Sequence, residues 1–161
     1  MTPLSSFSLC GAPATREGPV GALLHEGRET GLRIHAASLE AQFQVQPGLF
    51  LLFFTEDSPY EEQLQILLLD PRFQILDGLT LYQPYTPGIL ANLEPQGEQR
   101  LRFDFFTDTR LLLSVNPEGA FHVRRRLPSF ASALKGRFFS RHYLALQEFA
   151  GTRNKEFRHA Q

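Results

Sequence analysis

The sequence lacks the residues from which most metal, redox and phosphate sites are built. Cys10 is its only cysteine, so the chain forms no internal disulfide and contains no cysteine-based zinc pattern. Neither a G-x-G-x-x-G pattern nor a Gly-Lys-Ser/Thr phosphate loop occurs. The five histidines are scattered, without the spacings that gather a zinc site. We therefore predict no cofactor and no metal.

Long apolar runs are also missing. No segment approaches the roughly 18 apolar residues of a membrane span. Residues 1–8 carry no basic residue ahead of their short apolar part, which argues against a secretory signal. A cytoplasmic protein without a membrane span is therefore expected.

Lysine is scarce, and charge is unevenly distributed along the chain. Lys135 and Lys155 are the only lysines, against 14 arginines. Four arginines and twelve carboxylates give residues 1–99 a charge of −8, whereas twelve basic and five acidic residues give residues 100–161 a charge of +7. This split indicates an anionic partner for the second part, or an acidic and a basic surface that meet within one chain or in a homo-oligomer.

The patterns that are present favour β-strands. Residues 39–45 alternate between apolar and polar side chains, which is typical of a strand with one wet face. Residues 49–54, 66–69 and 111–113 are continuously apolar, as strands are when both of their faces are covered. We predict an antiparallel sheet of seven or eight strands, closed by barrel-like curling, by sandwiching or by a partner chain.

Two turn signals of the form x-Pro-x-Gly, at residues 94–97 and 116–119, suit three-residue hairpin loops. Together with a loop at residues 107–109 they predict a four-stranded meander over residues 89–126. In this register Phe103 lies opposite Leu113 on one side and Ile89 on the other. One face of the meander is then apolar, and the other carries most of the arginines.

The end of the chain predicts a helix. Pro128 stops the last strand, Ser129 suits a helix N-cap, and Gly151 suits the position after a helix. Apolar residues recur between them at helical spacing: Phe138, Phe139, His142, Tyr143, Leu146, Phe149 and Ala150. The predicted fold class is therefore α+β, mainly an antiparallel β-sheet with a C-terminal helix. The predicted organisation is a loosely ordered arm (1–18), a single β-rich domain with its helix (19–151) and a polar tail (152–161).

The polar face of the meander is the candidate binding site. Its members are Arg100, Arg102, Arg110, His122, Arg124 and Arg126. Guanidinium groups on adjacent strands repel one another unless water, carboxylates such as Asp104, or a ligand neutralise them. The alternatives are a solvated face, a face covered by the acidic residues 56–62, or a surface for an anionic partner.

No residue pattern identifies a catalytic group. Ser132 and Lys135 match a Ser-x-x-Lys motif, but the companion motifs of that enzyme class are missing. We interpret the protein as a non-enzymatic binding or adaptor domain that contacts an acidic protein partner through its arginine-rich face. The alternatives are a barrel-like domain for a small apolar or anionic ligand, and a nucleic-acid-binding module.

Overall fold

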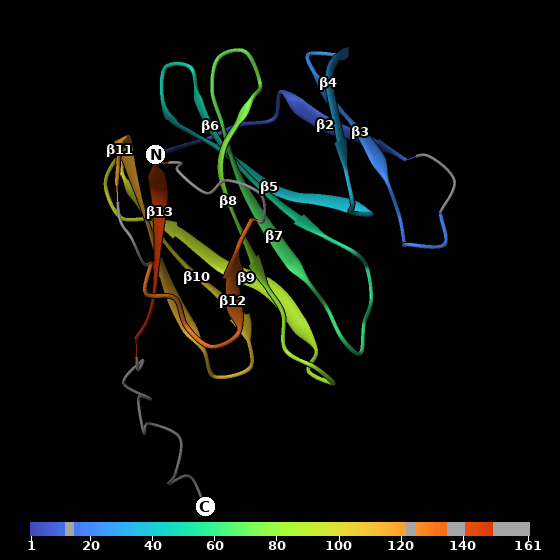
Figure 1. Cartoon of the computed structure of the whole chain (residues 1–161), viewed down its shortest axis with the longest axis vertical. Helices are drawn as coiled ribbons and strands as arrows, with labels where there is room; N and C mark the ends of the chain where they lie inside the picture. Colours follow the sequence, from blue (N-terminus) through green and yellow to red (C-terminus); the bar gives the residue numbers. More distant parts are fainter. Residues whose placement is uncertain (12–14, 122–124, 135–140, 150–161) are drawn as a thin grey trace, which may run out of the picture.

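The computed structural model describes residues 1–11, 15–121, 125–134 and 141–149, and all regular secondary structure in these ranges is β-strand. The strands form three antiparallel sheets arranged in layers (Figure 1). The predicted α+β class is therefore wrong, because the described part of the chain is all-β. Nor do its residues include a helix with the length and apolarity needed to cross a membrane.

The largest sheet lies in the middle of the molecule and has the strand order β1-β5-β6-β7-β8-β12. Its strands are β1 (Thr2–Pro3), β5 (Ser38–Gln46), β6 (Leu49–Thr55), β7 (Leu64–Leu69), β8 (Ile75–Leu81) and β12 (Ala131–Ala133). Strands β5 to β8 follow one another along the chain as an antiparallel meander. The short β1 and β12 pair at the two edges.

A four-stranded sheet covers one face of this central sheet and has the order β13-β11-β10-β9. Its strands are β9 (Gly88–Pro95), β10 (Arg100–Phe106), β11 (Arg110–Ala120) and β13 (His142–Phe149). The hairpin predicted around residues 94–97 is confirmed, since β9 and β10 are antiparallel neighbours and Gly97 adopts a φ of 79° in the turn.

A three-stranded sheet lies against the opposite face of the central sheet, with the order β2-β3-β4 (Figure 1). Its strands are β2 (Phe7–Gly11), β3 (Gly21–His25) and β4 (Arg28–Ile34). Residues 1–18, predicted as a loosely ordered arm, therefore contain β1 and β2. The predicted polar tail, 152–161, lies outside the described residues.

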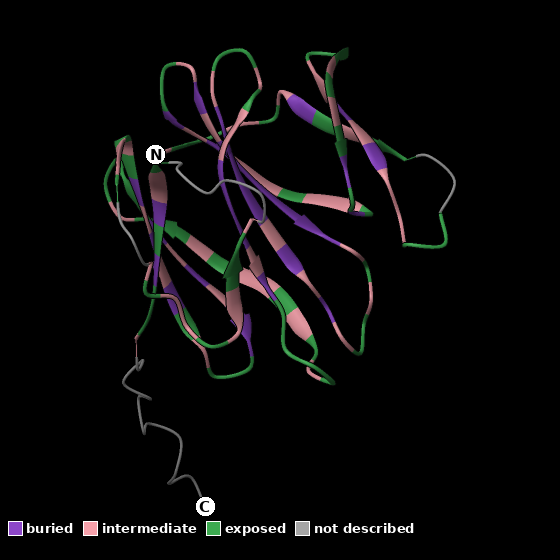
Figure 2. Ribbon diagram, in the orientation of Figure 1, coloured by how far each residue is buried: buried purple, intermediate pink, exposed green. Residues whose placement is uncertain are grey.

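Two apolar cores flank the central sheet, which explains the continuous apolar runs at residues 49–54 and 66–69. Leu51 and Phe53 of β6 point into the core shared with the four-stranded sheet, where the ring of Phe53 packs edge-on against Phe103 at 5.6 Å between centroids. Leu52 and Phe54 point into the core shared with the three-stranded sheet. Figure 2 shows the buried residues concentrated along β6 and β7. The prediction that both faces are covered is confirmed for residues 49–54 and 66–69, and separate sheets provide the cover, with no closed barrel among the described residues. It is not confirmed for residues 111–113, which lie in the outer four-stranded sheet, where Leu112 is only half-buried.

The predicted C-terminal helix is wrong because residues 142–149 form the edge strand β13. Leu144 and Leu146 are each 2% exposed, whereas Ala145 and Gln147 are exposed, which is the period of two of a strand. A short apolar segment, taken alone, fits both the period of a helix and the period of a strand. Pairing with β11 makes residues 142–149 a strand. Phe138, Phe139 and Ala150 of the predicted stripe lie outside the described residues, as does Gly151.

The second predicted hairpin, around residues 116–119, is not formed by the described residues, and residues 122–124 of its predicted second strand lie outside them. Strand β11 runs on through residues 116–119 to Ala120 with a shift in register, and its partner is β13. The loop between β10 and β11 places Phe103 opposite Leu111, two residues away from the predicted partner Leu113. A shift of two keeps every side chain on its predicted side, so the apolar face of these two strands is as predicted.

Candidate functional site

The outward side of β10 and β11 carries three of the candidate arginines. Arg100 and Arg102 alternate with the buried Leu101 and Phe103, and Arg110 lies directly opposite Asp104 in the sheet. Residues opposite each other on antiparallel strands project to the same side. We call this surface, with Arg100, Arg102 and Arg110 on it, the arginine face.

Two of these arginines are partly neutralised within the sheet. Arg102 lies 3.6 Å from a carboxylate oxygen of Glu94 on β9, and its guanidinium lies 5.4 Å from the centre of the Phe149 ring. Arg110 lies 3.8 Å from Asp104. The side chains of Arg102 and Arg110 are 36% and 48% exposed, and ion pairs of this kind contribute only about 0–1 kcal/mol. An incoming anion can therefore replace Glu94 or Asp104 as the partner of these arginines.

The acidic residues 56–62 do not supply the carboxylates beside these arginines. Glu62 is buried and accepts hydrogen bonds from the backbone N–H groups of Glu56, Ser58 and Gln63, at 2.9, 3.0 and 3.1 Å. Its carboxylate thus organises its own loop. The carboxylate beside Arg102 is that of Glu94, so the opposite charges of the two parts of the chain meet only in part.

Arg100 and Arg126 have no such counter-charge. Both side chains are exposed, and neither forms an ion pair or a side-chain hydrogen bond within the described residues. His122 and Arg124, also predicted for the site, lie outside the described ranges. The structure therefore describes four of the six candidate residues, and Arg100 and Arg126 are the two with free guanidinium groups.

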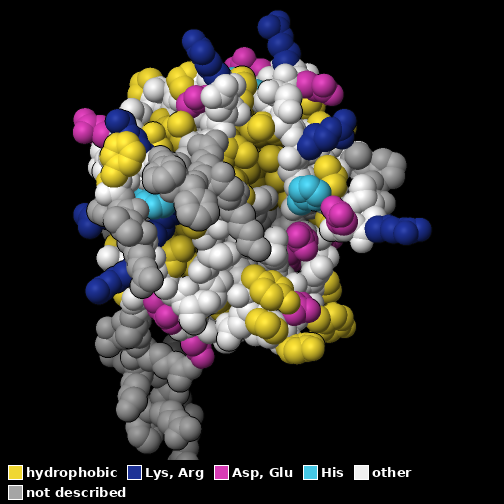
Figure 3. Space-filling model, viewed as in Figure 1, with side chains coloured by type: hydrophobic (Ala, Val, Ile, Leu, Met, Phe, Trp, Pro, Cys, Tyr) yellow, Lys and Arg dark blue, Asp and Glu magenta, His cyan; other side chains and the backbone are white. Residues whose placement is uncertain are grey.

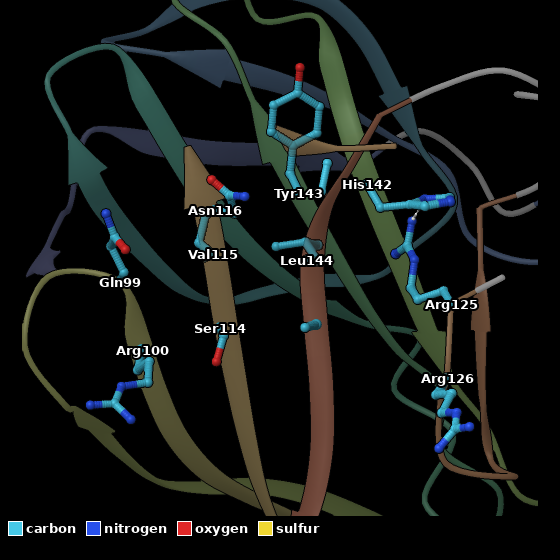
Figure 4. A pocket seen from close by; sticks show the side chains of 12 residues that line it. Gln99, Arg100, Ser114, Val115, Asn116, Arg125, Arg126, His142, Tyr143 and Leu144 are labelled. Carbon is cyan, nitrogen blue, oxygen red and sulfur yellow. Dashed lines mark hydrogen bonds between the residues drawn. The ribbon is translucent and has the colours of Figure 1, made fainter. Parts of the chain in front are cut away.

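Arg100 and Arg126 both line a hollow of about 560 Å³ that lies over β11 and β13 (Figure 4). Arg100 stands on β10 at one side of it, and Arg126 stands beyond β13 at the other side (Figure 4). The residues that line the hollow are Gln99, Arg100, Ser114, Val115, Asn116, Ala120, Arg125, Arg126, His142, Tyr143, Leu144 and Ala145. This set contains three arginines and a histidine but no aspartate or glutamate, so the lining favours an anion.

A buried ion pair holds one wall of the hollow. The Nη2 atom of Arg125 donates to Asp77 on β8 at 2.9 Å, and these side chains are only 10% and 6% exposed. The other oxygen of Asp77 accepts hydrogen bonds from the backbone N–H groups of Tyr143 and Leu144, at 2.8 and 2.9 Å. Asp77 therefore joins the central sheet to β13 and fixes the position of Arg125. Arg125 also contacts Nδ1 of His142 (Figure 4).

Sequence reasoning missed Asp77 and Arg125. Asp77 looks like a turn residue because Gly78 follows it, and Arg125 stands in the phase that the predicted meander turns inward. An arginine that faces the core needs a buried carboxylate as its partner, so the position of Arg125 in the predicted strand was the signal in the sequence for a buried ion pair. The sequence could not name the partner, because 48 residues separate the two.

Groups of three or more His, Cys, Asp or Glu residues placed to hold a metal ion are absent from the described ranges. Ser132 lies in β12, and Lys135, its partner in the Ser-x-x-Lys pattern, lies outside those ranges. The chain shows no significant match to protein-family models, to curated proteins or to solved structures. The geometry of the arginine face and its hollow is therefore the basis for a functional proposal.

Proposed function

We propose that the protein is a cytosolic, non-enzymatic binding domain that contacts an acidic protein partner through the arginine face and its hollow. The observation that carries the proposal is the pair of guanidinium groups, those of Arg100 and Arg126, on either side of a hollow. Among the described residues, neither group has a counter-charge and the lining of the hollow contains no carboxylate. Arginine binds carboxylates in a planar, bidentate arrangement, so two arginines at the sides of one hollow suit a segment rich in aspartate or glutamate.

The remaining lining residues support the same conclusion. Asn116, Gln99 and Ser114 carry neutral donors and acceptors that suit a peptide backbone. Arg102 and Arg110 continue the basic surface along β10 and β11, although Glu94 and Asp104 partly neutralise them. An acidic segment that follows the sheet from the hollow would meet all four arginines in turn.

The test uses a fluorescently labelled oligoglutamate peptide and, in parallel, affinity capture from the host. We expect Arg100→Glu with Arg126→Glu to weaken peptide binding at least about tenfold and to lose the captured acidic proteins, because two attractive pairs become repulsive. Binding should also weaken as salt is raised, since these charges are exposed.

The matched control is Arg28→Glu with Arg33→Glu, an exposed pair on β4 in the three-stranded sheet. It makes the same change in net charge on a different sheet and should leave binding nearly unchanged. Equal losses of peptide affinity in both double variants would mean that only the net charge matters, and the arginine face would then not be the binding site.

A small anionic ligand is the second candidate function. Arg125 supports it, because its Nε and Nη1 atoms are buried beside the hollow and have no hydrogen-bond partner among the residues that the structure describes. Native mass spectrometry of protein purified from its host should then show a retained small anion. Thermal stabilisation by phosphate or citrate at low millimolar concentration would agree with it, and a bare protein that neither anion stabilises would exclude this candidate.

A further inference from the structure

Exposed aromatic side chains gather at one end of the molecule, where the chain passes from the central sheet into β9. Five large hydrophobic residues are exposed in the described part of the chain, and four of them belong to this group. They are Tyr60, Tyr82, Tyr85 and Ile89, with exposed fractions of 86%, 40%, 92% and 78%. We call these four residues the tyrosine patch. Contiguous apolar surface of this kind marks interaction sites in soluble proteins.

The patch forms because two connections leave the central sheet at the same end. Strand β7 runs between the β6–β7 connection and the β7–β8 turn, so β8 returns the chain to the end at which β7 began. Glu61 then ties the two connections together, since its carboxylate accepts hydrogen bonds from the hydroxyl of Tyr82 and from the backbone N–H of Tyr85, the latter at 3.2 Å. Figure 3 shows hydrophobic side chains with carboxylates beside them at this end.

The surroundings of the patch are acidic. Residues 56–62 contain four carboxylates, and Arg72 is the only basic residue between positions 56 and 99. Arg72 lies in the β7–β8 turn, at the opposite end of β7. Burial, together with the neighbouring Glu62, raises the pKa of Glu56, although His35 partly offsets this. A cation that arrived here would relieve the repulsion between these carboxylates.

We propose that the tyrosine patch and the carboxylates of Glu56, Asp57 and Glu61 bind an arginine-bearing segment of another protein. Guanidinium groups stack on the faces of tyrosine rings and pair with carboxylates, and the patch offers both kinds of contact side by side. Tyr60 and Tyr85 supply open ring faces, and Glu61 supplies a carboxylate that the structure already holds in place. Charge complementarity selects a basic partner, whereas the arginine face selects an acidic one.

The experiment measures the binding of a short labelled peptide of alternating arginine and proline by fluorescence anisotropy. We expect binding that Tyr60→Ala with Tyr85→Ala weakens about tenfold, as the loss of two cation–π contacts at exposed sites would give. Tyr60→Phe with Tyr85→Phe keeps both ring faces and should retain most of the affinity. Urea unfolding of the alanine variant verifies its fold, which these exposed side chains do not support.

Charge is tested by a second pair of variants. Glu61→Gln should weaken binding several-fold, whereas Glu29→Gln, at an exposed position of β4, should not. A lysine version of the peptide should bind more weakly than the arginine version, because an ammonium group lacks the flat face that stacks on tyrosine. A glutamate version should not bind at the patch.

Three results would overturn the proposal: failure of the arginine peptide to bind, equally tight binding by the alanine variant and the native protein, or self-association through the patch. The last is checked by sedimentation velocity of the protein alone, where a dimer that Tyr60→Ala with Tyr85→Ala abolishes would assign the patch to a second copy. The Arg100→Glu with Arg126→Glu variant should bind the arginine peptide normally, so this proposal and the proposed function fail independently.

Discussion

At the scale of single residues, Asp77 makes the most consequential polar contacts in the described structure. Its two oxygens accept hydrogen bonds from Arg125, from the backbone of β13 and from the N–H of Gly78, the last at 2.8 Å. Removing one partner of a buried ion pair strands the other charge without compensation. We expect Asp77→Ala to cost about 3–5 kcal/mol in the free energy of unfolding, measured by urea denaturation.

The control for Asp77 is Asp104→Ala. Asp104 is 25% exposed and its pair with Arg110 spans 3.8 Å, so its loss should cost no more than about 1 kcal/mol. Combining Asp77→Ala with Arg125→Met removes both buried charges and should recover the part of the lost stability that comes from the unpaired guanidinium, but not the hydrogen bonds from the backbone N–H groups of β13. If both aspartate variants lose the same amount, the buried pair has no special role in joining β8 to β13.

Tyr82 provides a residue-scale test of the tyrosine patch. The hydrogen bond to Glu61 is the main cause that raises the pKa of the Tyr82 hydroxyl above the usual value, and burial raises it further. Glu61→Gln should therefore lower the pKa of Tyr82, as followed by NMR of ¹³C-labelled tyrosine across an alkaline pH titration. A raised pKa in the folded state means that this bond supports folding below the usual tyrosine pKa and ceases to do so as pH rises through the raised value. An unchanged pKa in the variant would show that Glu61 does not hold Tyr82.

At the scale of elements, β13 decides the fold class and can be tested directly. Leu146→Ala should cost about 2–5 kcal/mol because the side chain is buried against β11 and the central sheet, whereas Gln147→Ala should change stability by less than about 0.5 kcal/mol. Far-ultraviolet circular dichroism of the whole protein should show a β-type spectrum. Comparable losses at both positions would contradict a strand with one buried side.

The elements also show what the sequence could and could not predict. The side on which Leu101, Phe103 and Leu113 lie was predictable, because a period of two survives an error of two residues in strand pairing. The same reasoning failed for Ile89, predicted on the apolar side but 78% exposed. Strand β9 shifts register against β10, and Asn92 adopts a φ of 53°, so the alternation slips by one residue.

Phe106 illustrates a second limit of prediction from the sequence. Strand phase puts it on the arginine face, yet it is 4% exposed because the ring of Phe130 packs against it at 5.2 Å between centroids. Phe130 contacts Phe106 from the segment before β12, and no local sequence pattern predicts that contact. The candidate site follows the same rule, since strand phase groups Arg100, Arg102 and Arg110, while the hollow depends on tertiary contacts between distant segments.

At the scale of the whole molecule, the three stacked sheets have different roles: the central sheet contributes stability, and the outer sheets present surfaces for recognition. The central sheet is buried on both faces and contributes stability, since each fully buried leucine is worth about 1.5–3 kcal/mol. The outer surfaces and loop ends are then free for recognition. The arginine face lies on the four-stranded outer sheet, whereas three of the four residues of the tyrosine patch lie in the connections at one end of the central sheet and the fourth, Ile89, lies on β9.

The three-layer arrangement makes a distinctive prediction about two consecutive residues. Leu51 and Leu52 are both 0% exposed, but Leu51 points toward β10 and β11, and Leu52 points toward the three-stranded sheet. Leu51→Ala and Leu52→Ala should each cost about 2–5 kcal/mol, whereas a two-layer sandwich would lose that much at only one of the two positions.

Hydrogen exchange distinguishes the two cores. Leu52→Ala should speed exchange of the β3 amides, because Leu23 loses a packing partner, while Leu51→Ala should speed exchange in β10, beside Phe103. The two effects should be separable because the cores lie on opposite sides of one sheet. A variant that loosened both outer sheets equally would mean that the layers open as one cooperative unit, and an unaffected β3 in Leu52→Ala would contradict the third layer.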